Sequence, residues 1–125
     1  NVLHVIAAGN DGALTCSVYP LSFATIKSGW QTAKDVLTVG AIDNATNSIA
    51  SFSSRGPVKD GRLKPEIVAG GVAIISTTPN NSYGQDGGTS MAAPTVTGSL
   101  SLLTQRYKQL FGNLTPKGFL LKAFI

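Results

Sequence analysis

A serine stands between a pair of glycines and a long helical pattern, and this junction constrains the fold more than any other feature of the chain. Gly87 and Gly88 allow a tight turn and the close approach of another segment. From Met91 onward, apolar residues recur at helical spacing, which predicts an amphipathic helix that runs to about Phe111. These residues are Val96, Leu100, Leu103, Tyr107 and Leu110 or Phe111. Ser90 is therefore expected at the N-terminus of a helix, where free backbone N–H groups and the helix dipole stabilise negative charge.

Two interpretations of this serine follow from its position. Thr89 or Ser90 can act simply as an N-cap that accepts a hydrogen bond from a first-turn N–H. Ser90 can instead be a nucleophile in acyl transfer, because its attack on a carbonyl produces an oxyanion that the helix N-terminus stabilises. Pro94 is expected to lie in the first turn, where the missing N–H of a proline is tolerated. These residues alone favour the cap, so the choice depends on the sequence around them.

A second motif joins a strand to a turn near the start of the chain. The apolar run from Val2 to Ala8 lacks alternation, which is typical of a central parallel strand covered on both faces. The following Gly9-Asn10-Asp11-Gly12 is an ordinary turn sequence. The side-chain amide of Asn10 is also a neutral hydrogen-bond donor, which suits a group that stabilises an oxyanion without titrating.

The string Gly-Thr-Ser-Met-Ala-Ala-Pro from Gly88 to Pro94 resembles the nucleophile motif of the subtilisin-like serine peptidases, the subtilase family. Thr95 stands where that family usually has a non-catalytic histidine, and Gly70 stands where it commonly has proline. The Asn10 turn resembles the family segment whose asparagine points into the oxyanion hole. Further similar stretches follow in the family's order at residues 36–41, 50–57 and 64–69. The resemblance covers nearly all of residues 2–125, is weakest over residues 13–30, and favours the nucleophile interpretation.

The resemblance implies a serine endopeptidase that acts on a polypeptide substrate. Ser90 would attack the scissile carbonyl, while the Asn10 amide and the Ser90 N–H stabilise the oxyanion. The implied substrate-binding residues are Ala7, Ala8 and Gly9, which line one wall of the primary specificity pocket, together with Thr89. The implied fold is α/β, with a mostly parallel twisted sheet flanked by helices in three layers. The family also implies a secreted or cell-surface protein; no cofactor is expected, and no site for a structural calcium ion can be read from the sequence.

The sequence lacks the partners that such a serine needs, a histidine base and an aspartate that orients it. His4 is the single histidine, and neither it nor any aspartate stands in the context that the family uses. On a strand His4 shares a face with Val2 and Ile6, so we expect it to be partly buried under a helix, about 20 Å from Ser90. Residues 1–125 are accordingly predicted to be the nucleophile-bearing part of a catalytic domain. This part needs the rest of that domain as its partner and is inactive alone. The alternative is a catalytically dead homologue that uses the fold for binding or structure.

The remaining segments give a coarse secondary structure. Strands are predicted at residues 36–42, 67–69 and 72–77, with residues 74–77 and 82–85 forming a hairpin around Pro79-Asn80-Asn81. Residues 44–63 are predicted to be an exposed loop. Gly112 is expected to end the long helix, and Thr115 and Pro116 to start a last one as N-cap and N1.

Composition excludes several classes of function. The net charge is +4, but Arg55, Lys59, Arg62 and Lys64 are expected in one solvated loop without interleaved aromatic residues, so no nucleic-acid partner is predicted. No apolar run is long enough to span a membrane. Cys16 is the single cysteine and is expected to be a small buried residue outside any disulfide. A trans bond is expected at Tyr19–Pro20, although the family often has a cis bond at such a pair.

Overall fold

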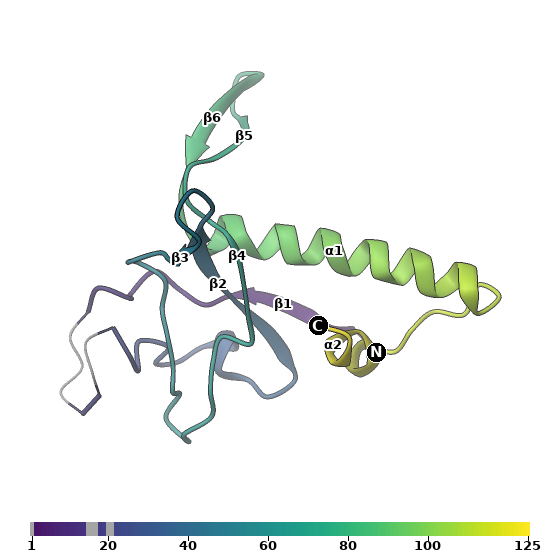
Figure 1. The fold of residues 1–125 in the computed structure, drawn as a ribbon, viewed down its shortest axis with the longest axis horizontal. Coiled ribbons are helices and arrows are strands. Elements are labelled where there is room, and N and C mark those ends of the chain that lie inside the picture. The colour runs from purple at the N-terminus through teal and green to yellow at the C-terminus, as the bar shows by residue number, and fades with distance from the viewer. Residues whose placement is uncertain (1, 15–17, 20–21) are drawn as a thin grey trace.

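The computed structural model of the chain describes residues 2–14, 18–19 and 22–125. Its elements, in order, are β1 (His4–Ala7), a 3-10 turn η1 (Trp30–Thr32), β2 (Val36–Asp43), β3 (Ser48–Ile49), β4 (Ile67–Gly70), β5 (Ile74–Thr78), β6 (Ser82–Asp86), α1 (Thr89–Leu110) and α2 (Gly118–Ala123). Among the described residues, β1 to β4 form a 4-stranded sheet, and β5 and β6 form a hairpin that projects away from it (Figure 1). The predicted α/β class, the hairpin and the long helix are confirmed.

Strand β2 is the centre of the sheet. It pairs in parallel with β1, where Val5 lies opposite Leu37, and with β4, where Val39 lies opposite Ile67. The short β3 pairs antiparallel with the end of β2. Parallel pairing places the carboxyl ends of β1, β2 and β4 at one edge of the sheet, and the polypeptide leaves all three strands there. In the described part of the chain β1 pairs only with β2, so the prediction of a central strand over residues 2–8 is wrong here.

One face of β2 packs against the first half of α1. Leu37, Val39 and Ala41 alternate on this face and are at most 1% exposed. They meet Ala92, Val96 and Leu100, which are spaced at four-residue intervals on α1. The second half of α1 extends past the sheet (Figure 1), and its apolar residues Leu102, Leu103 and Leu110 are exposed. The predicted amphipathic helix therefore forms over its full length but buries its apolar face only where the sheet reaches it.

The opposite face of β2 is covered by the segment that follows β3. Residues 44–63 were expected to be solvated on the basis of their composition, but Ser53, Ser54 and Val58 in this segment are buried. Lys64, also expected in solvent, is only 6% exposed, so that prediction is wrong as well. Serine hydroxyls account for part of this burial because they accept hydrogen bonds from backbone N–H groups of neighbouring segments. In the described residues this layer is extended chain and not a helix.

The ends of the helices give two further corrections. Gly112 has a φ of +62° after α1, as expected for the residue that follows a helix C-cap. Pro94 lies inside α1, one turn later than predicted, so it cannot donate the hydrogen bond that a helical residue would make to the Ser90 carbonyl. The last helix begins at Gly118 with Lys117 as N-cap, and not at Thr115 and Pro116.

Several expectations concern residues outside or only partly inside the described ranges. Cys16 and the Tyr19–Pro20 bond lie outside the residues that the structure describes, so both expectations stay predictions. Within the ranges it covers, no helix combines the length and the apolar character needed to cross a membrane.

Candidate functional site at the carboxyl edge of the sheet

The start of α1 is fixed against the carboxyl edge of the sheet by glycine backbone. The Gly88 N–H donates to the Gly71 carbonyl over 2.8 Å, and the Gly71 N–H donates to the Ile42 carbonyl over 3.0 Å. A Cβ at Gly71 would lie 2.6 Å from the Ala41 Cβ and 2.7 Å from the Gly88 oxygen. Only glycine therefore allows this approach, which brings the first turn of α1 to the strand ends.

Asn10 follows β1 at the same edge and contacts the first residue of α1. Its Oδ1 accepts hydrogen bonds from the Thr89 N–H over 3.0 Å and from the Thr89 Oγ1 over 3.1 Å. Thr89 Oγ1 in turn accepts a hydrogen bond from the Gly9 N–H over 3.1 Å. Asn10 Nδ2 lies on the other side of the amide, 3.2 Å from the position that a Gly88 Cβ would occupy. The structure thus brings Asn10 beside the residue that precedes Ser90.

Ser90 is the second residue of α1, and it is exposed. Its N–H has no carbonyl four residues earlier within the helix, so it can serve an external acceptor. The positive end of the helix dipole adds to the attraction for negative charge at this point. An exposed hydroxyl, a free helical N–H and a neutral amide therefore meet at one edge of the sheet, and this arrangement can bind an anion that forms on an attacked carbonyl.

The predicted substrate-binding residues are in different environments. Ala7 and Gly9 are partly exposed next to Asn10, so they can face a ligand. Ala8 is 1% exposed and packs with Ile26 and Val58, and Thr89 is 1% exposed with its hydroxyl engaged by Gly9 and Asn10. The side chains of Ala8 and Thr89 therefore hold the site in place, and any contact of these residues with substrate stays a prediction.

His4 differs from its prediction. It is exposed, whereas Leu3 and Val5, on the other face of β1, pack against the core beside α1. The expectation of a partly buried histidine under a helix is therefore wrong, because α1 covers the opposite face of this edge strand. His4 lies at the amino end of β1 and Asn10 follows its carboxyl end, so the predicted separation of His4 from the site agrees with the strand direction.

At the amino end of the sheet lies a charged cluster that sequence reasoning missed. The Lys64 ammonium group is buried and contacts Glu66 Oε1 at 2.6 Å, Thr38 Oγ1 at 2.9 Å and the Val36 carbonyl at 3.3 Å. Lys122 of α2 contacts the same Glu66 oxygen at 3.2 Å and the Val36 carbonyl at 2.9 Å. The Thr38 N–H donates to Glu66 Oε2 over 2.8 Å. This cluster joins β2, β4 and α2 at the end opposite Ser90.

The cluster also sets the protonation of Glu66. Partial burial raises the pKa of this carboxyl group, but the hydrogen bonds from Lys64 and Thr38 and the positive charge of Lys64 outweigh that effect. The pKa of Glu66 is consequently below its ordinary value, and the group is a carboxylate at neutral pH. The only signal in the sequence was the Lys-Pro-Glu spacing at residues 64–66.

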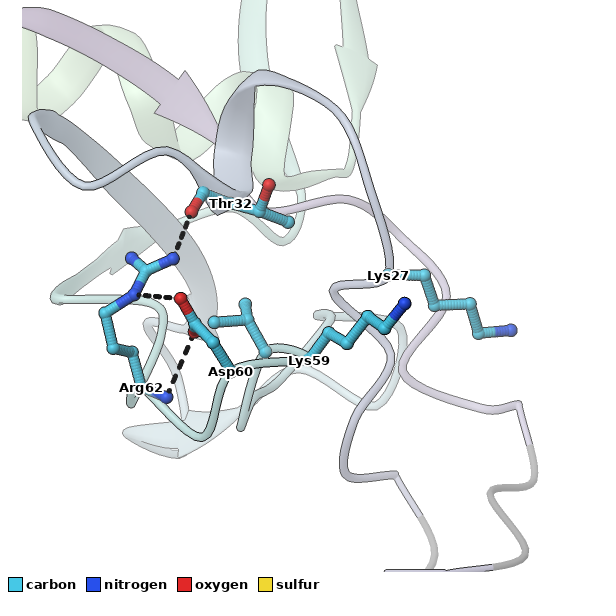
Figure 2. A pocket seen from close by; sticks show the side chains of 6 residues that line it. Lys27, Thr32, Lys59, Asp60 and Arg62 are labelled. Atoms are coloured by element: carbon cyan, nitrogen blue, oxygen red, sulfur yellow. Dashed lines mark hydrogen bonds and ion pairs between the residues drawn. The ribbon is translucent and has the colours of Figure 1, made fainter.

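A separate open hollow contains none of the predicted site residues. It is lined by Lys27, Thr32, Val58, Lys59, Asp60 and Arg62 (Figure 2). Arg62 donates to Asp60 Oδ2 over 2.9 Å and to the Thr32 carbonyl over 2.8 Å. The hydrogen bond from Arg62 holds the pKa of Asp60 below its ordinary value. The arginine is thus used to fix loops, and Lys27 and Lys59 are exposed.

No group of three or more His, Cys, Asp or Glu side chains gathers as a metal site in the described parts of the chain.

The chain is similar in sequence and in structure to known proteases. The model of the family described as "Subtilase family" matches residues 1–125. Subtilisin DY of Bacillus licheniformis is 37% identical over 110 residues, which cover 87% of this chain and 35% of that protein. C5a peptidase of Streptococcus pyogenes is 43% identical over 68 residues, covering 54% of this chain and 6% of that protein. The structure of the Clostridium perfringens CspB protease matches with a TM-score of 0.65 and 32% identity, over 77% of this chain and 21% of that one. The chain therefore spans well under half the length of these relatives.

Proposed function

This chain belongs to the subtilase family, and on that premise we propose that it carries the nucleophile and the oxyanion site of a serine endopeptidase. Ser90 supplies the attacking Oγ, and Asn10 Nδ2 and the Ser90 N–H bind the oxyanion. The observation that carries the proposal is the pair of hydrogen bonds from Thr89 to Asn10 Oδ1, which join residues 79 positions apart. They hold the Asn10 amide beside the serine.

The hydrogen bonds of Asn10 determine which end of its amide is available. Oδ1 is occupied by the two Thr89 donors, so the Nδ2 group provides the donors for a ligand. A neutral amide keeps these donors at every pH in the working range. An oxyanion hole needs donors about 2.7–3.1 Å from the oxyanion, and the Ser90 N–H supplies the second one.

The reaction also needs a general base. As Oγ bonds to the carbonyl carbon, a general base takes its proton, and that proton passes to the leaving amine when the C–N bond breaks. Water then hydrolyses the acyl ester on Ser90. His4 is the single histidine and lies exposed at the amino end of β1. The parent protein is the complete protein of which residues 1–125 are a segment. We assign the base and its aspartate to parts of the parent protein outside these residues.

The substrate is a polypeptide. Ala7 and Gly9 are small and partly exposed beside Asn10, which supports their role as one wall of the pocket for a substrate side chain. The remainder of the catalytic domain is the second partner of this segment, and we propose a secreted or cell-surface location for the parent protein.

Two variants of the parent protein test the assignment. Ser90→Ala is expected to abolish both casein hydrolysis and labelling by a fluorophosphonate probe. Asn10→Ala is expected to lower kcat about 10²–10³-fold, the effect known for the matching asparagine of subtilisin, with KM nearly unchanged because the oxyanion exists only in the transition state. Ser99→Ala, an exposed serine of the same helix, is the matched control and should keep full activity. A parent protein whose Ser90 is never labelled would support the binding homologue instead.

The segment of residues 1–125 alone tests where the base lies. Without a base Ser90 keeps its proton at neutral pH, so we expect no hydrolysis of casein and no rapid labelling. Rapid, stoichiometric labelling of Ser90 in this segment would place the base within residues 1–125 and contradict the assignment above.

A further inference from the structure

One buried residue contacts the chain on both sides of Asn10. The Ser54 N–H donates to the Gly9 carbonyl over 2.9 Å, and Ser54 Oγ accepts a hydrogen bond from the Asp11 N–H over 2.9 Å. Ser54 itself is 0% exposed. The residues before and after Asn10 are thus both hydrogen-bonded to Ser54, which lies more than 40 positions away in the sequence.

Asn10 depends on this support because packing does not hold it. Asn10 and Asp11 are exposed, and Gly9 has a φ of +104°, which only glycine adopts without strain. A Cβ at Gly9 would lie 3.1 Å from Ser54 Oγ, so the hydroxyl and the Gly9 backbone are already in close contact. An exposed turn with a glycine at its start has several accessible conformations. The two Ser54 hydrogen bonds flank Asn10 directly and select one of them, together with the bonds from the Gly9 N–H to Thr89 Oγ1 and from the Gly12 N–H to the Phe52 carbonyl.

We propose that Ser54 is a positioning residue for the oxyanion site: it fixes the Gly9–Asp11 backbone so that the Asn10 amide meets Thr89 with Nδ2 directed at the reacting carbonyl. The inference rests on the function proposed above. Thr89 holds the side chain of Asn10, and Ser54 holds its backbone. Loss of the Ser54 hydroxyl should therefore lower transition-state stabilisation while leaving the binding of substrate in the ground state largely intact.

The neighbouring Ser53 provides a closely matched control. It is 1% exposed, and its Oγ accepts a hydrogen bond from the Ala41 N–H over 3.0 Å. Both serines are therefore buried and both accept a backbone N–H, but the Ser53 partner lies on β2 and not in the Asn10 turn. A purely structural role predicts the same consequences for the two serines, whereas a positioning role predicts that they differ.

The kinetic test compares Ser54→Ala and Ser53→Ala in the parent protein, with active molecules counted by fluorophosphonate titration. We expect Ser54→Ala to lower kcat about three- to tenfold, the effect of one lost hydrogen bond, with KM within about twofold. Ser53→Ala should leave kcat within about twofold even if the melting temperature falls. In an Asn10→Ala background Ser54→Ala should have no further effect on kcat. An equal loss of kcat in both backgrounds, or an equal loss for the two serines, would overturn the proposal.

A second measurement does not depend on activity. With 15N-asparagine labelling of the parent protein, Ser54→Ala should shift and broaden the Asn10 side-chain amide resonances, and Ser53→Ala should not. Unchanged Asn10 resonances in Ser54→Ala would overturn the inference and leave the proposed function standing. An Asn10→Ala variant with normal kcat would overturn the proposed function, and the inference with it, even where the resonances shift. Ser54→Cys, which fills the site with a somewhat larger group and supplies only a weak acceptor, replaces Ser54→Ala in both tests if the alanine variant does not fold.

Discussion

At the carboxyl end of the parallel sheet the chain is held by uncharged groups, whereas at the amino end it is held by charged groups around the buried Lys64 ammonium. The first end consists of the Asn10–Thr89 hydrogen bonds and the close contact of Gly71 with Gly88. The second consists of Lys64 and Lys122 on the carboxylate of Glu66. The same strands thus connect two ends built from different chemistry.

The difference is explained by what each end has to do. In the proposed reaction a negative charge forms at the carboxyl end, and donors that never titrate can meet it at any pH. The amino end has no such task, so paired charges can join β2, β4 and α2 there. We therefore expect substitutions at the two ends to separate catalysis from stability.

The largest expected effect is on stability, from Lys64→Met in the parent protein. The variant removes a charge-assisted hydrogen bond to Glu66 and leaves Thr38 Oγ1 and the Val36 carbonyl without their Lys64 donor, while the partly exposed Glu66 keeps Lys122. We expect the free energy of unfolding to fall by about 2–3 kcal/mol. Urea denaturation measures this loss, and kcat per active molecule should stay within about twofold. Lys59→Met, at an exposed lysine of the same segment, is the control and should leave both quantities unchanged. A large fall in kcat for Lys64→Met would show that the two ends are not separable.

Gly71→Ala should affect both stability and catalysis, because the added methyl group collides with Ala41 and with the Gly88 oxygen. Overpacking of this kind costs about 1–3 kcal/mol, and it displaces the start of α1 and so lowers kcat. Gly98→Ala is expected to change the free energy of unfolding in the opposite direction. Gly98 is exposed in α1 with open space around it, so alanine should stabilise the helix by about 0.5–1 kcal/mol. Thermal unfolding and kcat of both variants measure the contrast; equal behaviour would contradict it.

Thr89→Val keeps the shape of the side chain but removes its hydroxyl from Gly9 and Asn10. We expect kcat to fall about tenfold with little change in KM, since the Asn10 amide loses one of its two Oδ1 donors. Thr89→Ser retains the hydroxyl and should stay within about twofold of the original kcat, which corresponds to less than half of one hydrogen bond of about 1 kcal/mol. A valine variant with normal kcat would show that the Thr89 N–H alone orients Asn10.

The smallest expected effect is the acid limb of the stability curve. Because the pKa of Glu66 is lowered in the folded chain, its contribution is complete above the unfolded value of 4.5 and is lost as the pH falls through the folded value. Glu66→Gln should therefore unfold with a weaker pH dependence below about pH 4.5, the ordinary carboxyl range. Urea midpoints between neutral and acidic pH measure this. Parallel curves for the two proteins would mean that Glu66 does not contribute.

The site was largely predictable because its signals are local or belong to one motif. The glycine pair before Ser90, the helical spacing after it and the turn at Asn10 each identify a backbone shape, and the family order places them together. The charged cluster was not predictable in this way. Lysine in a loop-like stretch is normally solvated. Lys64 is buried because the fold brings it to Thr38, 26 residues earlier in the sequence, and the sequence carries no signal for that contact.

The predicted burial of His4 and of the full apolar face of α1 was wrong because both depend on the arrangement of the sheet. Apolar spacing in α1 is regular over its 22 residues, which span about 33 Å, while the 4 residues of β1 span only about 13 Å. The helix is therefore longer than the sheet surface that can bury its apolar face. The face of β1 that α1 covers depends on how the strands pair. The apolar run of residues 2–8, which does not alternate, does not contain that information.

The long sequence separation within the site has a consequence for the timing of synthesis. Asn10 leaves the ribosome long before Thr89, and their hydrogen bonds span 79 positions, so this part of the molecule cannot be complete until α1 has been made. Contacts of such high sequence separation also form slowly, because a large loop must close first. The oxyanion site proposed here would accordingly be among the last parts of this segment to form.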